Sequence, residues 1–154
     1  MKKLAKGWIR LADYDLHAAE VLINIELILP NIAAFHCQQT IEKYFKAFLV
    51  ENDIQVVRTH DLIKLNGMIN EIKDLRIDEK KLMIINEVYT ESRYPGELGL
   101  IPEGMPSKKQ VEEFLAFAKE IKAIIMEVLH PLKVTSTQTD DAIAPLEPLD
   151  DNPR

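Results

Sequence analysis

Residues 31–51 read NIAAFHCQQTIEKYFKAFLVE, and this stretch decides the fold class. When its residues are spaced at the 100° intervals of an α-helix, apolar and polar side chains separate onto opposite sides. The apolar side holds Ala34, Cys37, Ile41, Tyr44, Phe45 and Phe48, and the polar side holds His36, Gln39, Lys43 and Lys46. The stretch therefore predicts an amphipathic helix, capped by Asn31, with a large aromatic core face.

A second helix is expected before it, over residues 4–29. Apolar residues recur there at helical spacing, which predicts the core face of the helix. The predicted core stripe consists of Leu4, Trp8, Leu11, Asp15, Ala18, Leu22, Ile25 and Leu29, with Asp15 as the polar exception. Toward residue 29 this helix is apolar nearly all round, which predicts a second contact surface and hence a homodimer. The last helix has a widened apolar stripe, including Phe117, Ile124 and Val128, that supports the same expectation.

Two further helices are expected in the middle of the chain. Thr59 is a good N-cap for a helix over residues 60–73, and Asp61 then lies in its first turn, where the helix dipole favours a carboxylate. Asp78 is expected to cap a helix that runs to Glu91, with core residues Leu82, Ile85, Val88 and Tyr89.

A capping box formed by Ser107 and Gln110 begins the last expected helix, which ends near residue 130. Five amphipathic helices without a strand pattern predict an all-α, antiparallel up-and-down helical bundle over residues 1–130. Residues 131–154 lack periodicity and are rich in Pro and acids, so we expect a disordered acidic tail.

The charge balance limits the classes of partner. The chain has 25 acidic and 19 basic residues, a formal net charge of -6. The residues after His130 hold five acids and two bases, so half of this net charge lies in the tail. Without a global basic field, binding of duplex DNA is not expected.

Other features bear on the compartment. The single cysteine, Cys37, has no partner for an internal disulfide, which favours a cytoplasmic protein. Gly7, Arg10 and Asp13 interrupt any signal-peptide apolar region, and no segment has the roughly 20 apolar residues of a membrane span.

Familiar catalytic and cofactor signatures are missing from the sequence. It has no Gly-rich phosphate loop, no His-Glu-x-x-His helix and no cysteine pair, so we expect neither a cofactor nor a metal. Asp13, His17 and Glu20 share one helix face at metal-ligand spacing, but that face is expected to be solvated.

Three spaced motifs carry a family resemblance. The first is Gln39, Glu42, Lys43, Lys46 and Ala47; the second is Thr59-His60-Asp61-Leu62; the third is Arg93-Tyr94-Pro95. With Trp8 and Asp15-Leu16 before them, the chain resembles the HEPN domain family over about residues 5–130. This resemblance implies a helical bundle that dimerises. It also implies either a metal-independent endoribonuclease or toxin, often paired with a nucleotidyltransferase antitoxin, or a non-catalytic nucleotide-binding module.

The nuclease members of that family carry an Arg followed, after four to six residues, by a His. By resemblance Arg93 stands at the motif Arg, but residues 94–100 contain no His. Arg10 and His17 have the required spacing, but Leu11 follows Arg10 and both lie on the outer face of the first helix. The nuclease motif is therefore incomplete.

The expected site is a polar groove at the bundle surface. We expect a nucleotide or RNA to be bound there by His36, Gln39, Lys43, His60, Asp61, Arg93 and Tyr94. These residues also have purely structural interpretations. Those of the second helix could form its solvent-exposed face, His60 and Asp61 could serve only to start the third helix, and Tyr94 could serve only to end the fourth. Asp15, amid apolar residues, needs a partner such as Arg93 or a lysine of the second helix.

We favour a homodimeric module that binds a nucleotide, an RNA or a nucleotidyltransferase partner without strong catalysis. One alternative is a metal-independent endoribonuclease toxin of a toxin–antitoxin pair, with His36 or His60 replacing the missing motif His and Arg93 stabilising charge. The other is a purely structural dimerisation module.

Overall fold

The computed structural model describes residues 1–25, 29–56, 58–91 and 106–130, with the side chains of 88–91 not described. Arg93, Tyr94 and the expected tail, residues 131–154, lie outside the described residues. The described part contains five α-helices and no strand: α1 Lys3–Asn24, α2 Pro30–Glu51, α3 Leu62–Asn70, α4 Glu79–Glu91 and α5 Lys108–Leu129. The predicted all-α bundle of five helices is confirmed.

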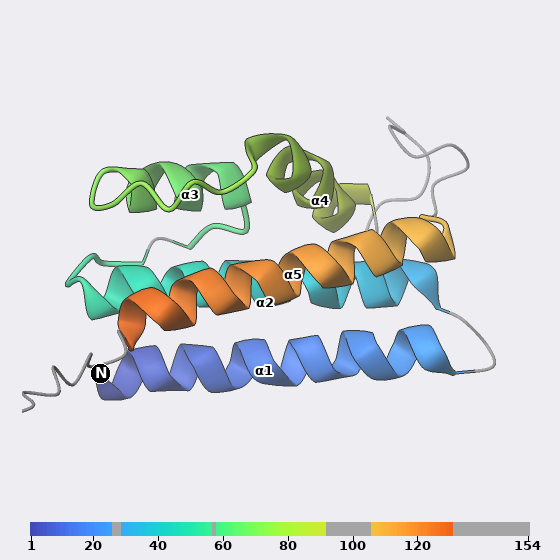
Figure 1. Ribbon diagram of the computed structural model, residues 1–154, viewed down its shortest axis with the longest axis horizontal. Helices are drawn as coiled ribbons and strands as arrows, with labels where there is room; N and C mark the ends of the chain where they lie inside the picture. The colour runs from blue at the N-terminus through green and yellow to red at the C-terminus, as the bar shows by residue number, and fades with distance from the viewer. Residues whose placement is uncertain (26–28, 57, 92–105, 131–154) are drawn as a thin grey trace, which may run out of the picture.

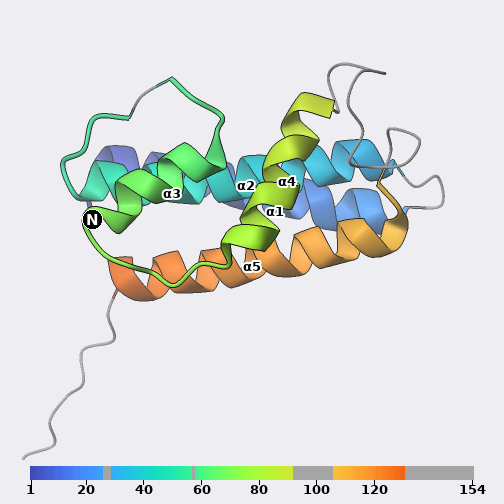
Figure 2. The same cartoon turned by 90° about the horizontal axis from the view of Figure 1, so that it is seen from above.

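The three long helices, α1, α2 and α5, lie side by side, and α3 and α4 pack over them as a second layer (Figures 1 and 2). Two ion pairs fix the direction of α5, because Lys122 contacts Asp13 and Lys119 contacts Glu20. Residue numbers therefore rise along α5 as they fall along α1, and α5 runs in the same direction as α2. The end of α5 consequently lies beside the start of α1 (Figure 1).

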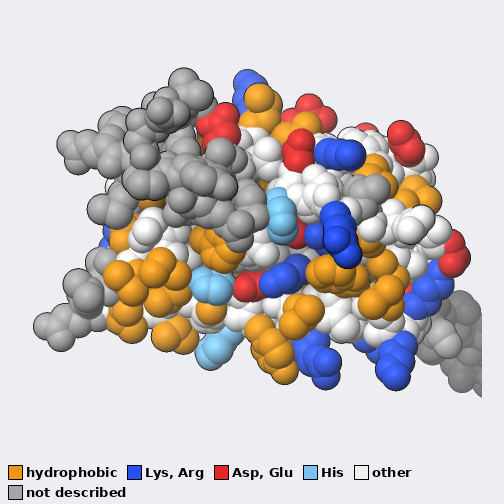
Figure 3. Space-filling view, turned by 180° about the vertical axis from the view of Figure 1, so that it is seen from behind, with side chains coloured by type: hydrophobic (Ala, Val, Ile, Leu, Met, Phe, Trp, Pro, Cys, Tyr) orange, Lys and Arg blue, Asp and Glu red, His pale blue; other side chains and the backbone are white. Residues whose placement is uncertain are grey.

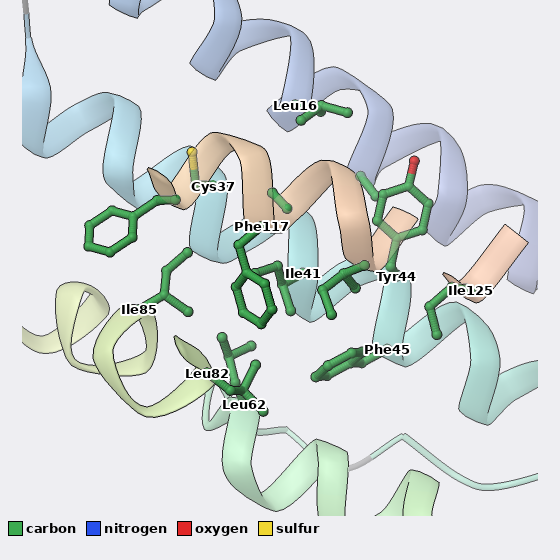
Figure 4. Close-up of a cluster of buried hydrophobic side chains, with 14 of the residues drawn as sticks. Leu16, Cys37, Ile41, Tyr44, Phe45, Leu62, Leu82, Ile85, Phe117 and Ile125 are labelled. Atoms are coloured by element: carbon green, nitrogen blue, oxygen red, sulfur yellow. The ribbon is translucent and has the colours of Figure 1, made fainter. Parts of the chain in front are cut away.

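The core is centred on α2, and its predicted apolar face is confirmed. Side chains from all five helices meet there (Figure 4). The residues at its centre include Leu16 of α1, Cys37, Ile41, Tyr44 and Phe45 of α2, Leu62 of α3, Leu82 and Ile85 of α4, and Phe117 and Ile125 of α5. Phe117 is therefore a core residue and not part of a widened outer stripe.

The predicted core stripe of α1 is correct only in part, because Leu22 packs against the core but several other members lie outside it. Its buried face is formed by Ala5, Ala12, Asp15, Leu16, Ala19 and Ile23. Leu4, Leu11 and Ile25, which we expected inside, are 63%, 44% and 37% exposed. The physical reason is packing distance: small alanines let α1 approach α2 closely, which moves the larger apolar side chains to the outside. Asp15 is buried as predicted.

The helix starts were predicted with mixed success. The side chain of Asp78 accepts hydrogen bonds from the backbone N–H groups of Lys80 and Lys81, and both halves of the Ser107–Gln110 capping box are present. Asp61, not Thr59, is the N-cap of α3, because its carboxylate accepts from the N–H groups two and three residues later. The Thr59 hydroxyl accepts from the Asp61 N–H instead.

The start of α2 also differs from the prediction. It begins at Pro30 without a side-chain cap, so Asn31 does not have the predicted capping role. Proline suits this first position because it has no N–H to leave unsatisfied. None of the five described helices is long and apolar enough to cross a membrane.

Candidate functional site

A row of charged and polar side chains runs along α2, where α1 packs on one side and the chain leading to α3 passes on the other. Every third or fourth residue of a helix lies on the same face, so α2 supplies most of the row. We call it the polar strip, and it consists of His36, Gln39, Glu42, Lys43 and Lys46 of α2 with Asp15 of α1 and His60. Figure 3 shows histidine, acidic and basic side chains close together between hydrophobic patches on this face.

Asp15 organises one end of the polar strip. One carboxylate oxygen, Oδ1, lies 2.8 Å from Nδ1 of His36. The other, Oδ2, accepts a hydrogen bond from Nζ of Lys43. The buried carboxylate therefore has the partner that its apolar surroundings require. That partner is a lysine of α2, one of the two alternatives predicted from the sequence.

Glu42 organises the other end. Its side chain is 3% exposed, and Oε1 accepts from Nζ of Lys46 at 2.6 Å. Oε2 lies 3.0 Å from Nδ1 of His60 and accepts from Nε2 of Gln39 at 3.1 Å. The Lys46 side chain is 7% exposed, so this is a buried ion pair with additional hydrogen bonds, the arrangement that buried charges need.

Gln38 connects this end of the strip to the chain before α3. Its side-chain oxygen accepts from Nε2 of Gln39 at 2.8 Å, and its own Nε2 donates to the backbone oxygen of His60 at 2.9 Å. The position of His60 is therefore held by its ring and by its backbone.

Both ends of the strip have the same chemical design. A carboxylate can only accept, so the hydrogen of each neutral imidazole lies on Nδ1 and Nε2 is the basic nitrogen. Two carboxylates face two ammonium groups, so the net charge of the strip is set by the two histidines. It is neutral when both rings are neutral and positive when either is protonated. Such a site can attract phosphate and can hold or move a proton at Nε2.

A groove adjoins the Lys46 end of the strip. It has a volume of about 630 Å³ and is lined by Trp8, Lys46, Ile54 and Arg58, among others. The Nζ atom of Lys46 lies 5.2 Å from the centroid of the Trp8 ring. The buried indole nitrogen of Trp8 has no hydrogen-bond partner within the described ranges. This combination of apolar wall, aromatic ring and cations suits a nucleobase with its phosphate.

The structure brings four of the predicted site residues into the strip, namely His36, Gln39, Lys43 and His60. Asp61 is engaged differently: Oδ1 accepts from two backbone N–H groups of α3 and from Nδ2 of Asn86. Arg93 and Tyr94 lie outside the described residues.

The sequence-based site omitted Glu42, Lys46 and Gln38, which are all buried. Two signals in the sequence point to them. Glu42 and Lys46 are four residues apart, the spacing of a helical ion pair. Gln38 lies one residue after Cys37, beside the core face of α2, so a polar side chain there needs partners.

Asp13 and Glu20, which we considered as metal ligands with His17, have other roles. Oδ1 of Asp13 accepts from the Tyr44 hydroxyl at 2.5 Å and from Nζ of Lys122 at 2.6 Å. Burial, and secondarily the hydrogen bond to Asp13, raise the pKa of Tyr44, so its hydroxyl remains a donor. The hydrogen bond from Lys119 lowers the pKa of Glu20. No three acids, histidines or cysteines gather in metal-binding geometry in the described part of the chain.

Comparison with known proteins identifies the family. The model of the HEPN domain matches residues 5–129, which is most of the chain. This chain belongs to the HEPN domain family. It is also 30% identical over 142 residues to the protein named "Putative toxin MJ1304" of Methanocaldococcus jannaschii, a match that covers 82% of this chain and 89% of the relative.

Two solved structures share the HEPN bundle. TT1696 from Thermus thermophilus superposes with a TM-score of 0.67 at 22% identity, covering 82% of this chain and 98% of that protein. ST0689, described as an archaeal HEPN homologue, gives 0.65 at 23% identity and covers 84% of this chain and 100% of that protein. At these identities the likeness establishes the fold.

Proposed function

We propose that this HEPN protein binds single-stranded RNA or a nucleotide, with phosphate at the polar strip and a base in the adjoining groove. The observation that carries the proposal is the pairing of each buried carboxylate with one lysine and one histidine. This arrangement holds three accessible hydrogen-bond donors for a phosphate, Lys43, His36 and His60, in fixed positions, while the carboxylates balance the lysine charges in the free protein. An incoming phosphate can accept charge-assisted hydrogen bonds from these groups.

The relative named "Putative toxin MJ1304" supports a role in a toxin–antitoxin pair, and a nucleotidyltransferase partner fits the same proposal. We place the homodimer contact on the exposed side of α1, where Val21 and Ile25 are 48% and 37% exposed. By resemblance, Arg93 belongs to the same ligand site.

Binding can be tested with a fluorescently labelled single-stranded RNA in the presence of a metal chelator. Lys43→Gln should weaken binding and should reduce the slope of log K against log salt by about 0.7, the value for one lost phosphate contact on a single strand. Lys109→Gln, an exposed lysine at the start of α5, is the matched control and should leave both quantities unchanged. If the wild-type protein binds neither this RNA nor a nucleoside triphosphate, the proposal is wrong.

A second candidate function is a metal-independent endoribonuclease, and one observation favours it. Asp15 and Glu42 each engage Nδ1 of a histidine, which orients the ring as a carboxylate does in a general acid–base pair. His36 and Glu42 are six residues apart on α2, so the two pairs are anchored about 9 Å apart along the helix.

In that reaction one imidazole would take the proton of the ribose 2′-hydroxyl, and the other would give a proton to the leaving 5′-oxygen. This function would be established if the wild-type protein cleaves RNA in the presence of the chelator and both His36→Gln and His60→Gln abolish the cleavage. His17→Gln is the control, because His17 is a surface histidine whose side chain is 78% exposed. RNA binding without cleavage would support the first proposal and contradict the nuclease.

A further inference from the structure

The outer side of α1 near its start carries three cations and two exposed leucines. We call Lys3, Leu4, Lys6, Gly7, Arg10 and Leu11 the basic patch. Leu4 is 63% and Leu11 is 44% exposed, whereas a core residue of the same helix, Leu16, is 7% exposed. Within the parts of the chain that the structure describes, no acid forms an ion pair with the three cations. The patch is both apolar and uncompensated in charge.

The surface of the basic patch is hollowed at Gly7. A hollow of about 620 Å³ is lined by Lys3, Leu4, Lys6, Gly7 and Arg10. A Cβ atom placed on Gly7 would meet nothing within 4 Å, so the glycine is not required by a neighbouring element. The hollow therefore has room for aliphatic side chains, and the cations on its rim favour a ligand with negative charge.

A segment of the same chain has the complementary chemistry. Residues 140–151 read DDAIAPLEPLDD, with five acids and no base. Its three large apolar residues, Ile143, Leu146 and Leu149, recur at every third position. Pro145 and Pro148 favour polyproline II, which has three residues per turn, so these side chains would share one edge of the extended segment.

The spacing of the two apolar rows agrees. Three residues of polyproline II span about 9.3 Å. Leu4 and Leu11 are seven residues apart, or about 10.5 Å along α1. Neighbouring apolar residues of the segment can therefore contact Leu4 and Leu11, with the Gly7 hollow between them.

The segment begins within reach of the patch. Lys122 pairs with Asp13 and α5 is antiparallel to α1, so the end of α5, seven residues later, lies level with Lys6. Both figures of the fold place the end of α5 at the start of α1 (Figures 1 and 2). Asp140 lies ten positions after His130, and a chain of this length can span about 33–36 Å. This exceeds the roughly 10 Å between the axes of packed helices.

We propose that residues 140–151 dock on the basic patch of their own chain. Two neighbouring residues among Ile143, Leu146 and Leu149 lie against Leu4 and Leu11, on either side of the Gly7 hollow, and the flanking acids pair with Lys3, Lys6 and Arg10. The contact covers an exposed apolar surface and keeps three cations from binding polyanions indiscriminately. The inference does not rest on the proposed function, although Leu4 also lines the groove beside Lys46.

The test uses energy transfer in the full-length protein. Trp8 is the single tryptophan and lies next to Gly7, so it serves as the donor. An Ala144→Cys thiol carries a dansyl acceptor, and it labels selectively because Cys37 is buried. The efficiency is compared between this protein and the variant that adds Lys3→Gln, Lys6→Gln and Arg10→Gln. Lys80→Gln, Lys108→Gln and Lys109→Gln form the control triple, which removes the same charge from the starts of α4 and α5.

If the segment docks, the labelled parent protein should show efficient energy transfer at low salt and less efficient transfer at high salt. The patch variant should show the parent's high-salt efficiency at every salt concentration. The control triple should behave as the labelled parent protein does. Equal transfer in the parent and the patch variant would overturn the proposal. Transfer that rises with protein concentration would assign the contact to a second copy and would also overturn it.

Discussion

Lys46 lies over the indole ring of Trp8, with Nζ 5.2 Å from the ring centroid, while the same Nζ atom donates to Glu42 at 2.6 Å. The ammonium group is thus held between a carboxylate and an aromatic face in a place where it is almost inaccessible to water. Either partner alone gives modest stabilisation to a surface lysine. In a buried position their loss leaves a charge without compensation.

Removing only the carboxylate should therefore be costly. Glu42→Leu is expected to lower the free energy of unfolding by about 3–5 kcal/mol, because it leaves the Lys46 ammonium buried and unpaired. Adding Lys46→Met should recover most of this loss, since a well-packed apolar pair can replace a buried ion pair. Urea unfolding of the two variants measures the difference.

The pair Lys81–Glu120 provides the matched comparison. These side chains are 55% and 49% exposed at a separation of 3.7 Å. Glu120→Gln should change the free energy of unfolding by less than about 1 kcal/mol. Equal losses in Glu42→Leu and Glu120→Gln would contradict the view that burial makes the first pair critical.

Cys37 gives a prediction about pH. Burial raises the pKa of its thiol from 9.0 to about 12. Because the folded state holds the proton more tightly, this group contributes stability that is fully present below 9.0 and is lost as the pH rises toward about 12. Near neutral pH, native Cys37 should react with a disulfide reagent far more slowly than the thiol of the urea-unfolded chain. Equal rates in the two states would show that the thiol is accessible.

The bundle and the core face of α2 could be predicted from the sequence because their apolar pattern has one interpretation. That of α1 has two. The large apolar residues and the alanines of α1 both recur at helical spacing, so either set could form the buried face. Only the structure with α2 in place shows that the face with Ala5 and Ala12 is the buried one. The polar strip depends on tertiary contacts as well. Glu42 and Lys46 look like a surface pair in sequence, and their burial follows from the position of Trp8 and His60.

The exposed apolar side of α1 supports a prediction about oligomeric state. Val21→Glu combined with Ile25→Glu should give monomers, because a dimer contact would then bury unpaired charges. Ile72→Glu is the control, since Ile72 follows α3 and is 40% exposed, similar to Ile25. Sedimentation at micromolar concentration separates the two outcomes. Wild-type protein that sediments as a monomer would remove the dimer from the proposed function.

The last prediction concerns Arg93, which the family resemblance places in the ligand site. Asp15 is already satisfied by Lys43 and His36, so it does not depend on Arg93 as an ion-pair partner. Arg93→Ala should therefore leave the free energy of unfolding within about 0.5 kcal/mol of the wild-type value. If its guanidinium holds a phosphate, RNA binding should weaken by about 1.5–3 kcal/mol, the range for a hydrogen bond to a charged group.

Arg93→Lys distinguishes charge from geometry. A lysine retains the charge but not the paired N–H groups that fit a phosphate, so its RNA affinity should fall between those of the wild type and Arg93→Ala. Anisotropy titrations measure the affinities, and thermal melts of the same samples report on folding. A large loss of stability in Arg93→Ala would make Arg93 structural. Unchanged affinity in Arg93→Ala would remove it from the site, and the polar strip would then have to bind phosphate through Lys43 and the two histidines.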